Sequence, residues 1–362
     1  MKIIHCADLH LDSRLGTNLG TEKAKERRKE ILLSFERMVE YAKENSVRAI
    51  IIAGDLFDKT QITIATKKIV KNVIMQNSDI DFFYLRGNHD EGGFFEEDEI
   101  VPENLKTFNK DNWTTYQYPE ENLTISGIEF GKKNDVEIYN SLNLEKDKKN
   151  IVILHGQESE NDSKGGAEII NLKKLKNKNI DYLALGHIHT YKKEKLDERG
   201  IYCYPGCLDG RGFDELGEKG FVLLDIEENS INSEFIKFSS RSLEWIQVDI
   251  TGLSELNQIK EKIINETEDI SEKSLVRIDL TGEKEIGDEI DIQYLNKSLE
   301  NRFYFVKIED CRKIKIDYLK YKNDISLKGE FIRLVLDQSD IDEEEKSEII
   351  STGIKALSNE EI

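Results

Sequence analysis

Five of the six histidines in this chain follow short apolar segments, and this placement constrains the fold more than any other feature. Each segment has the length of a buried strand and ends at a polar residue. The segments are 2–7, 49–53, 81–85, 150–154 and 181–185. The residues that follow them are Asp8, His10, Asp55, Asn88, His89, His155, His187 and His189. Open α/β sheets place their sites at the carboxyl ends of strands, so we expect these side chains to converge.

Helical patterns separate these strands. Residues 23–45 carry apolar side chains at a 3.6-residue period, and Ile31, Phe35 and Met38 mark the apolar face. Residues 62–75 show a second, shorter helical pattern. Strands that alternate with helices predict an α/β sandwich.

The pattern changes twice after residue 200. Short strands between 201 and 236 extend a second sheet, and a small α+β unit follows from residue 241. The residues from 326 onward read as two helices with apolar stripes and an excess of acidic residues. We therefore expect three parts, namely 1–240, 241–322 and 325–362.

Composition excludes several classes of protein. The four cysteines in 362 residues are too few for a disulfide framework, and we expect reduced thiols and a cytoplasmic location. The first residues lack the apolar stretch of a signal peptide, and no apolar run reaches the ~20 residues that span a bilayer. The net charge of −20 lacks the basic footprint usual for nucleic-acid binders.

The polar residues at the strand ends have the chemistry of a metal centre. Imidazole nitrogens with carboxylate and amide oxygens suit Mn, Fe or Zn better than Mg alone. Seven ligands exceed the needs of one divalent ion and suit two ions that share a bridge. Two ions about 3.5–4 Å apart can clamp a phosphate group. His89 is then free to act as a general acid or to orient the substrate, whereas His5, inside the first strand, is expected to be structural.

These residues lie in five blocks that resemble those of the calcineurin-like metallophosphoesterase superfamily. The blocks are Asp8-Leu9-His10, Gly54-Asp55-Leu56-Phe57-Asp58, Gly87-Asn88-His89-Asp90, His155-Gly156 and Gly186-His187-Ile188-His189. Within the superfamily the chain is most similar to the SbcD group of DNA repair nuclease subunits. That similarity includes Tyr204-Pro205-Gly206, Phe213-Asp214-Glu215 and Lys219-Gly220. It implies a calcineurin-like β-sandwich flanked by helices, a small α+β capping domain for DNA recognition, and C-terminal helices.

The resemblance also implies a role for each block. It assigns Asp8, His10 and His189 to one metal ion, Asn88, His155 and His187 to a second, and Asp55 to a bridge. His89 becomes the catalytic histidine, and Asp90 orients it. Members of the group prefer Mn²⁺, cut double-stranded DNA as exonucleases and single-stranded DNA as endonucleases, and are commonly dimers. Their partner is an SbcC-like ABC ATPase, whose coiled coil docks on the C-terminal helices.

Two other functions remain open from the sequence. A small-molecule or cyclic-nucleotide phosphodiesterase would need the same blocks, and the negative net charge favours it, whereas the helical tail favours the nuclease. A non-catalytic scaffold that bridges an ATPase to DNA is the third hypothesis, although every expected ligand position is filled.

Several basic residues have two interpretations. Arg27 with its neighbours at 28 and 29 is expected to be a solvated helix face rather than a phosphate contact. Arg211 and Lys219 either contact substrate or stabilise a turn. The basic stretch 312–322 is either a phosphate track or surface charge, and the glycine-containing stretch 164–166 is either a substrate loop or a plain turn. The thiol of Cys207 lies close to the expected site in sequence, and oxidation sensitivity there is a minor alternative to an unreactive thiol.

Overall fold

The computed structural model describes the chain except for residues 16–18, 59–61, 91–94, 96–99, 130–135, 160–168, 286–287, 316–323 and 358–362. The stretch 164–166 and the lysines at 320 and 322 thus lie outside the described residues. The chain divides into two compact units, Met1–Leu243 and Glu244–Ile362. Each unit is described by itself.

The first sheet of the first unit has six strands, in the order β14-β13-β1-β2-β3-β4. Its inner strands β1, β2 and β3 are parallel, and β13 runs antiparallel to β1. Their parallel alignment places the carboxyl ends of β1, β2 and β3 at one edge. The strands are β1 (Lys2–Cys6), β2 (Val47–Ala53), β3 (Asp81–Leu85), β4 (Leu105–Thr107), β13 (Gly220–Ile226) and β14 (Ile231–Lys237).

The second sheet also has six strands, in the order β11-β12-β10-β7-β6-β5. Its central strands β6, β7, β10 and β12 are parallel, and antiparallel strands flank them. The strands are β5 (Thr114–Tyr118), β6 (Leu123–Gly127), β7 (Lys149–His155), β10 (Tyr182–Gly186), β11 (Lys192–Lys195) and β12 (Ile201–Tyr204). A separate pair, β8 (Gln157–Ser159) and β9 (Ile169–Asn171), follows β7 in the chain.

The two sheets pack face to face around one apolar core. Ile3, Ile51 and Phe83 of the first sheet share this core with Ile151 and Ala184 of the second. The strands are also buried on their outer faces, which explains their continuous apolar runs.

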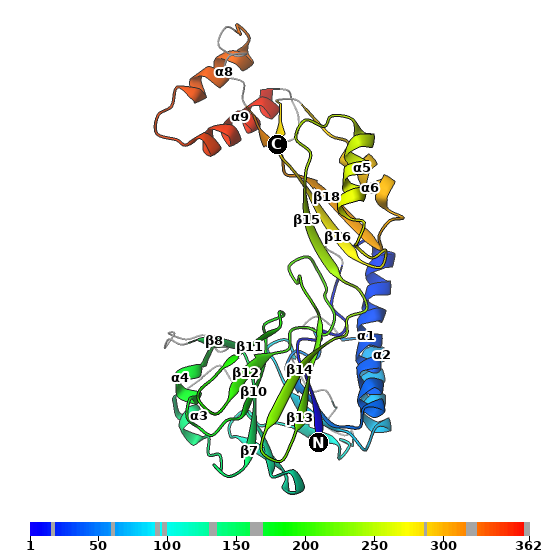
Figure 1. Ribbon diagram of the computed structural model, residues 1–362, viewed down its shortest axis with the longest axis vertical. Coiled ribbons are helices and arrows are strands. Elements are labelled where there is room, and N and C mark those ends of the chain that lie inside the picture. Colours follow the sequence, from blue (N-terminus) through cyan, green and yellow to red (C-terminus); the bar gives the residue numbers. More distant parts are fainter. Residues whose placement is uncertain are drawn as a thin grey trace. The chain divides into compact units, whose positions relative to one another are not determined.

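Helices cover both outer faces of the sandwich (Figure 1). α1 (Thr21–Glu44) buries Ile31, Phe35 and Met38 and lies beside α2 (Ile64–Gln76). On the second sheet, α3 (Val136–Ser141) and α4 (Leu172–Leu175) contribute to a second apolar cluster. A short 3₁₀ helix, Pro119–Glu121, joins β5 to β6. The predicted α/β sandwich is confirmed.

The second unit begins with a three-stranded sheet, β15-β16-β18, whose core packs against two helices. Ile259 of α5 and Leu295 of α6 meet Ile278 of β16 in this core. The elements are β15 (Leu243–Asp249), α5 (Leu256–Glu266), β16 (Leu275–Thr281), α6 (Ile292–Leu299) and β18 (Phe305–Asp310). A small parallel pair, β17 (Glu283–Lys284) with β19 (Lys313–Ile314), completes it.

Two helices, α8 (Leu327–Leu336) and α9 (Glu343–Leu357), form a hairpin at the end of the described chain. Ile332 packs with Ile350 and Ile354 between the helices, whereas Leu327 and Leu334 stay exposed on α8. The hairpin therefore buries only part of its apolar surface.

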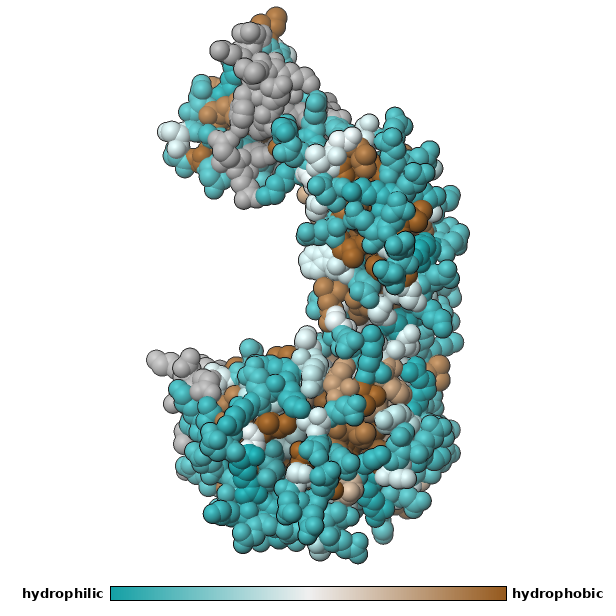
Figure 2. Space-filling model, viewed as in Figure 1, coloured by the Kyte–Doolittle hydropathy of each residue, from teal (hydrophilic) through white to brown (hydrophobic). Residues whose placement is uncertain are grey.

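Most of the surface visible in Figure 2 is hydrophilic, with hydrophobic residues between the hydrophilic ones. Among the described residues, no helix combines the length and the apolar character that crossing a bilayer requires.

Candidate metal centre

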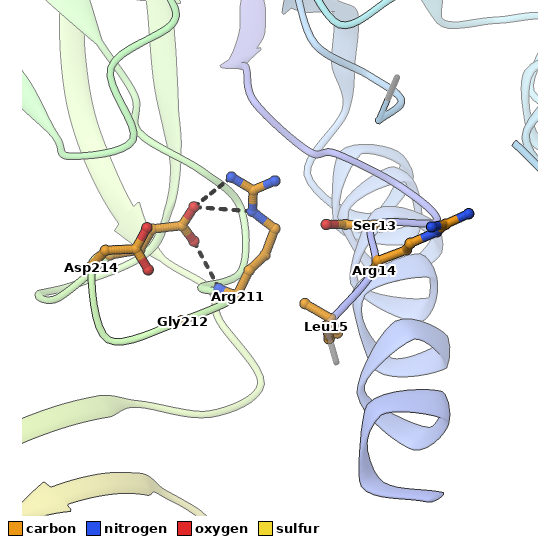
Figure 3. Close-up of a pocket in the computed structure, with 7 residues that line it drawn as sticks. Ser13, Arg14, Leu15, Arg211, Gly212 and Asp214 are labelled. Atoms are coloured by element: carbon orange, nitrogen blue, oxygen red, sulfur yellow. Dashed lines mark hydrogen bonds and ion pairs between the residues drawn. The ribbon is translucent and has the colours of Figure 1, made fainter. Parts of the chain in front are cut away.

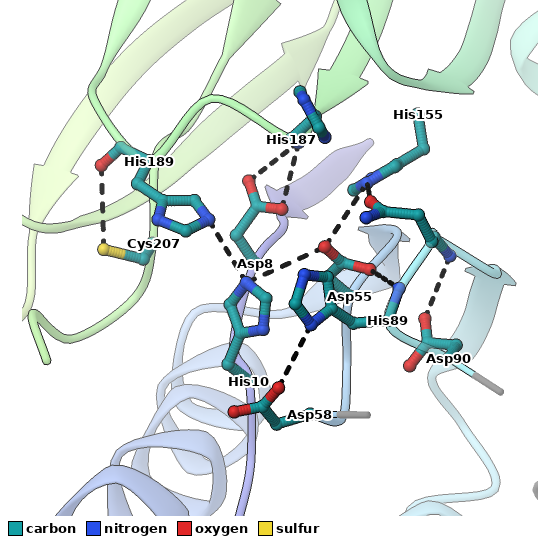
Figure 4. Close-up of polar contacts among 12 residues, drawn as sticks. Asp8, His10, Asp55, Asp58, His89, Asp90, His155, His187, His189 and Cys207 are labelled. Atoms are coloured by element: carbon teal, nitrogen blue, oxygen red, sulfur yellow. Dashed lines mark hydrogen bonds and ion pairs between the residues drawn. The ribbon is translucent and has the colours of Figure 1, made fainter. Parts of the chain in front are cut away.

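The structure brings together the eight residues that the sequence placed at strand ends (Figure 4). They lie at or just after the carboxyl ends of β1, β2, β3, β7 and β10, so both sheets contribute to the cluster. His5 is excluded from it, because its Nδ1 lies 2.9 Å from the hydroxyl of Tyr182 in the interior of the sandwich. The expected convergence of five strand ends is confirmed.

The backbone at this edge adopts conformations that are rare for residues with side chains. Asp8, His10, Asp55 and His187 have φ values of 52°, 43°, 51° and 104°. Such conformations cost of the order of 1–3 kcal/mol each and gather at functional sites. Gly54, at φ 93°, allows His155 to approach, because a Cβ there would lie 2.1 Å from the ring Nδ1.

Asp55 lies between the two halves of the cluster. Its Oδ2 is 3.4 Å from Nε2 of His155 and 3.7 Å from Nε2 of His10. Its Oδ1 accepts the backbone N–H of His89 at 2.8 Å. The carboxylate is thus placed to serve both halves, as a bridging ligand must.

One half of the cluster contains Asp8, His10 and His189. Nε2 of His10 lies 3.1 Å from Nε2 of His189, and the Asp8 carboxylate completes a group whose ligand atoms all lie within 4.8 Å of one another. Both oxygens of Asp8 accept the backbone N–H of His187 at 3.0 Å. Asp8 therefore also fixes the loop that carries the two histidines after β10.

The other half contains Asn88, His155 and His187. Nε2 of His155 lies 3.0 Å from Oδ1 of Asn88, and its Nδ1 donates to the carbonyl oxygen of Ala53 at 2.9 Å. The ring of His187 packs edge-on against that of His155, with centroids 5.4 Å apart. The three side chains belong to three different strand ends.

The atoms that face one another in this cluster are mainly proton acceptors. Because Nδ1 of His155 donates to a carbonyl, loss of the second ring proton leaves a lone pair at Nε2 directed toward Asn88 and Asp55. Burial lowers the pKa of His10 to about 3, so this ring stays neutral. Burial also lowers the pKa of His155, but the hydrogen bond and charge of Asp55 raise it to about 9. The cluster attracts positive charge, and its mixed N/O donors fit divalent cations.

A model of the calcineurin-like phosphoesterase family matches residues 1–191 of the chain, which is more than half of its length. The chain belongs to the calcineurin-like phosphoesterase family. It is accordingly a metal-dependent phosphoesterase, a hydrolase of phosphate esters.

Curated relatives of this phosphoesterase include two kinds of protein. An uncharacterized metallophosphoesterase, YhaO of Bacillus subtilis, is 28% identical over 69% of the chain and 64% of its own length. The DNA double-strand break repair protein Mre11 of Aeropyrum pernix is 27% identical over the same shares. The Mre11 protein of Sulfolobus acidocaldarius is 24% identical over 93% of the chain and 86% of its own length. The chain thus spans less than two thirds of the first two relatives.

Solved structures with some likeness include TT1561 of Thermus thermophilus, at 16% identity and a TM-score of 0.40. A dimetal phosphatase from Danio rerio has 10% identity and a TM-score of 0.39. They cover 65% and 66% of this chain, and 98% and 99% of their own lengths.

The partner of His89 in this phosphoesterase differs from the sequence prediction. Nδ1 of His89 lies 3.0 Å from Oδ1 of Asp58, and the hydroxyl of Ser13 also bonds to that carboxylate. The Asp90 carboxylate accepts backbone N–H groups of Phe57 at 2.9 Å and of Gly87 at 3.0 Å. Among the described residues, Asp58 therefore holds the ring of His89, and Asp90 holds the loop. Asp58 lies in the second block, so its position three residues after Asp55 was a signal in the sequence.

The loop after β12 contains residues whose role the sequence left open. Glu215 accepts from Nδ1 of His189 at 2.8 Å, and Arg211 pairs with the same carboxylate at 2.6 Å. Nζ of the buried Lys219 donates to the carbonyl oxygen of His189 at 2.7 Å. Lys219 and Glu215 therefore support a predicted metal ligand. Cys207 is buried beside them, and burial raises the pKa of its thiol, which opposes reactivity.

A cavity of about 180 Å³ adjoins this loop (Figure 3). It separates residues 211–215 from residues 13–15, and the Ser13 hydroxyl and the Arg211 guanidinium face it from opposite sides. Ser13 bonds to Asp58, and Arg211 lies 3.3 Å from Nδ1 of His189. The cavity thus adjoins side chains that support the residues of the cluster, among them His189 and His89.

Proposed function

We propose that this phosphoesterase is a Mn²⁺-dependent DNA nuclease, the catalytic subunit of a DNA double-strand-break repair complex. The observation that carries the proposal is the alignment with the Sulfolobus acidocaldarius Mre11 protein, which covers 93% of the chain. That alignment includes most of the second unit, whereas the family model ends at residue 191. A similarity that continues through both units supports a function that uses both.

Two divalent ions would occupy the cluster at the strand ends. Asp8, His10 and His189 would hold one ion, and Asn88, His155 and His187 would hold the other. Asp55 would bind both, which its position between Nε2 of His10 and Nε2 of His155 supports. The nitrogen and oxygen donors suit Mn²⁺.

The bound ions would supply Lewis-acid chemistry at the scissile phosphate. His89 then provides the proton. Its ring is half-buried, and because Nδ1 is hydrogen-bonded to Asp58, Nε2 remains for the substrate. From there it can donate a proton to the leaving oxygen, and the Asp58 carboxylate stabilises the charged ring before transfer.

The expected partners follow from the same proposal. Leu327 and Leu334 stay exposed after α8 packs on α9, and this supports docking of an SbcC-like ATPase coiled coil there. Exposed Ile64 and Met75 on α2 support a homodimer. The free thiols, three of them buried, support a cytoplasmic location.

A small-molecule or cyclic-nucleotide phosphodiesterase is the second candidate, and charge favours it. The chain has a net charge of −20, and two described residues of the basic stretch, Arg312 and Lys315, are paired with acids. Arg312 pairs with Asp288 and Asp310, and Lys315 pairs with Glu283. Little positive charge is left there for a DNA backbone among the described residues.

The deciding experiment measures cleavage of a labelled linear duplex and of circular single-stranded DNA, in Mn²⁺ at low salt. Wild type is compared with His89→Ala and Asp55→Ala, and His5→Gln is the matched control because His5 lies outside the cluster. Cleavage lost in the first two variants and kept in the third supports the nuclease. Hydrolysis of bis(p-nitrophenyl) phosphate without any DNA cleavage, even after addition of the ATPase, would favour the second candidate.

A further inference from the structure

Two side chains of opposite hydrogen-bonding character compete for one atom of His189. Oε1 of Glu215 lies 2.8 Å from Nδ1 of His189, and Nη2 of Arg211 lies 3.3 Å from the same nitrogen. A carboxylate only accepts hydrogen bonds, and a guanidinium only donates them. A hydrogen bond with Glu215 therefore requires a proton on Nδ1, whereas a hydrogen bond from Arg211 requires that Nδ1 carries none.

The outcome of this competition decides whether His189 can bind a metal ion. If Nδ1 donates to Glu215, the neutral ring presents a lone pair at Nε2, the atom that faces His10 at 3.1 Å. If Nδ1 accepts from Arg211, the proton sits on Nε2 and blocks coordination there. Only the first tautomer is a ligand.

We propose that Glu215 is a positioning residue that selects the metal-binding tautomer of His189 against Arg211. The proposal rests on the metal centre assigned above but requires no particular substrate. The hydrogen bond from Nδ1 to Glu215 is favoured because Glu215 also binds Arg211. Arg211 donates to Oε1 of Glu215 from Nε at 3.0 Å and from Nη2 at 2.6 Å. The guanidinium therefore stabilises the Glu215 carboxylate instead of donating to Nδ1 of His189.

The surroundings of His189 make this selection necessary. Glu215 is 3% exposed, so water does not take its place at Nδ1. Lys219 fixes the carbonyl oxygen of His189 at 2.7 Å, which restrains the backbone from which the ring extends. The ring is thus held beside both neighbours, and its tautomer is set by them.

At His155, in the other half of the centre, the described residues place no such competitor at Nδ1. Nδ1 of His155 faces the carbonyl oxygen of Ala53, which can only accept. A carbonyl fixes the tautomer by itself. The inference is therefore specific to His189 and predicts that its two neighbours act in opposite directions.

The first test measures Mn²⁺ binding to the full chain by equilibrium dialysis and metal analysis. Glu215→Leu should weaken binding of one of two ions by about 10–100-fold, the usual effect of losing such a partner. The double variant Glu215→Leu/Arg211→Met should bind more tightly than Glu215→Leu, because the opposing donor is gone. Equal or weaker binding by the double variant, or normal binding by Glu215→Leu, would overturn the proposal.

A matched control separates tautomer selection from the loss of an arginine–carboxylate pair elsewhere in the same unit. Asp181 and Arg199 form a two-point pair just before β10, at the opposite end of that strand from His189. Asp181→Leu should leave Mn²⁺ affinity unchanged. A loss equal to that of Glu215→Leu would mean that general destabilisation explains the result.

The second test reads the tautomer directly in the wild-type protein, and a variant serves only to assign the signal. Nitrogen-15 NMR of histidine-labelled, metal-free wild type, with His189→Asn for assignment, reports which ring nitrogen carries the proton. We expect Nδ1–H in neutral His189, and Nε2–H would refute the proposal. Because neither test uses DNA, a chain that passes both but cuts no DNA would contradict only the nuclease function.

Discussion

Replacing Arg27 with methionine should destabilise the first unit strongly, although the sequence suggested an exposed helix position. The side chain is fully buried on α1. Its guanidinium bonds to the Asp209 carboxylate, to the carbonyl oxygen of Gly210 at 2.8 Å and to the hydroxyl of Ser240 at 2.7 Å. Loss of one partner from a buried ion pair costs about 3–5 kcal/mol, because the other charge stays buried.

The surroundings of Asp209 set the value within that range. After the substitution its carboxylate keeps hydrogen bonds from the hydroxyls of Ser34 at 2.6 Å and Ser240 at 2.9 Å. These donors stabilise part of the charge, so we expect the free energy of unfolding to fall by about 3 kcal/mol. With a urea dependence of about 2–3 kcal/mol/M, the unfolding midpoint should shift by roughly 1–1.5 M.

The chain offers a clean assay because its two tryptophans, Trp113 and Trp245, lie in different units. In a Trp245→Phe background, the fluorescence of Trp113 reports unfolding of the first unit alone. Arg48→Met is the matched control, since exposed Arg48 makes one described hydrogen bond, to the carbonyl oxygen of Asp79. It should change stability by less than about 0.5 kcal/mol. Equal midpoints for Arg27→Met and Arg48→Met would refute the reasoning.

Three further predictions concern the metal centre and the stability of the first unit at acid pH. Asp58→Asn should lower phosphodiester turnover by about 10–100-fold with unchanged metal content, whereas Asp90→Asn should lower the melting temperature, because its carboxylate holds backbone N–H groups. Asp55→Asn should reduce bound Mn²⁺ from two ions to one or none, measured by metal analysis after dialysis. Burial raises the pKa of Glu30, but hydrogen bonds from Arg241 and Arg27 outweigh it and lower the pKa. Its stabilisation is therefore present above the unfolded pKa and lost as pH falls through the lower folded value. Wild type should accordingly lose more urea stability than Glu30→Gln between about pH 5 and pH 3.

The strands and the residues at their ends were predictable because the signals are local. An apolar run of five residues, such as 81–85, becomes a strand that is buried on both faces, and the block that follows it falls at the sheet edge. Parallel strands then bring the blocks of one sheet together, so Asp8 and Asp55 meet at the edge of the first sheet. His155 joins them because the second sheet packs on the first.

The partners of those residues were less predictable because they depend on tertiary contacts. Asp58 and Asp90 both lie near His89 in the described structure. The turn of the loop directs the Asp90 carboxylate toward backbone N–H groups and not toward the ring of His89. The burial of Arg27 depends on Asp209 and Ser240, which follow it by 182 and 213 residues. A single sequence gives no sign of such a contact. The roles of the three predicted parts in DNA recognition and docking stay predictions.

The predicted ligands of the centre also organise one another, and this links the strained backbone of the centre to its expected chemistry. Asp8 accepts the backbone N–H of His187, and Asp55 accepts that of His89, so each carboxylate holds a loop that carries another functional residue. These bonds help to offset the cost of the positive φ angles at Asp8, Asp55 and His187. A ligand carboxylate is therefore needed for loop geometry as well as for charge. Substitution of Asp8 should consequently impair metal binding at His187, a residue that the resemblance assigns to the other ion.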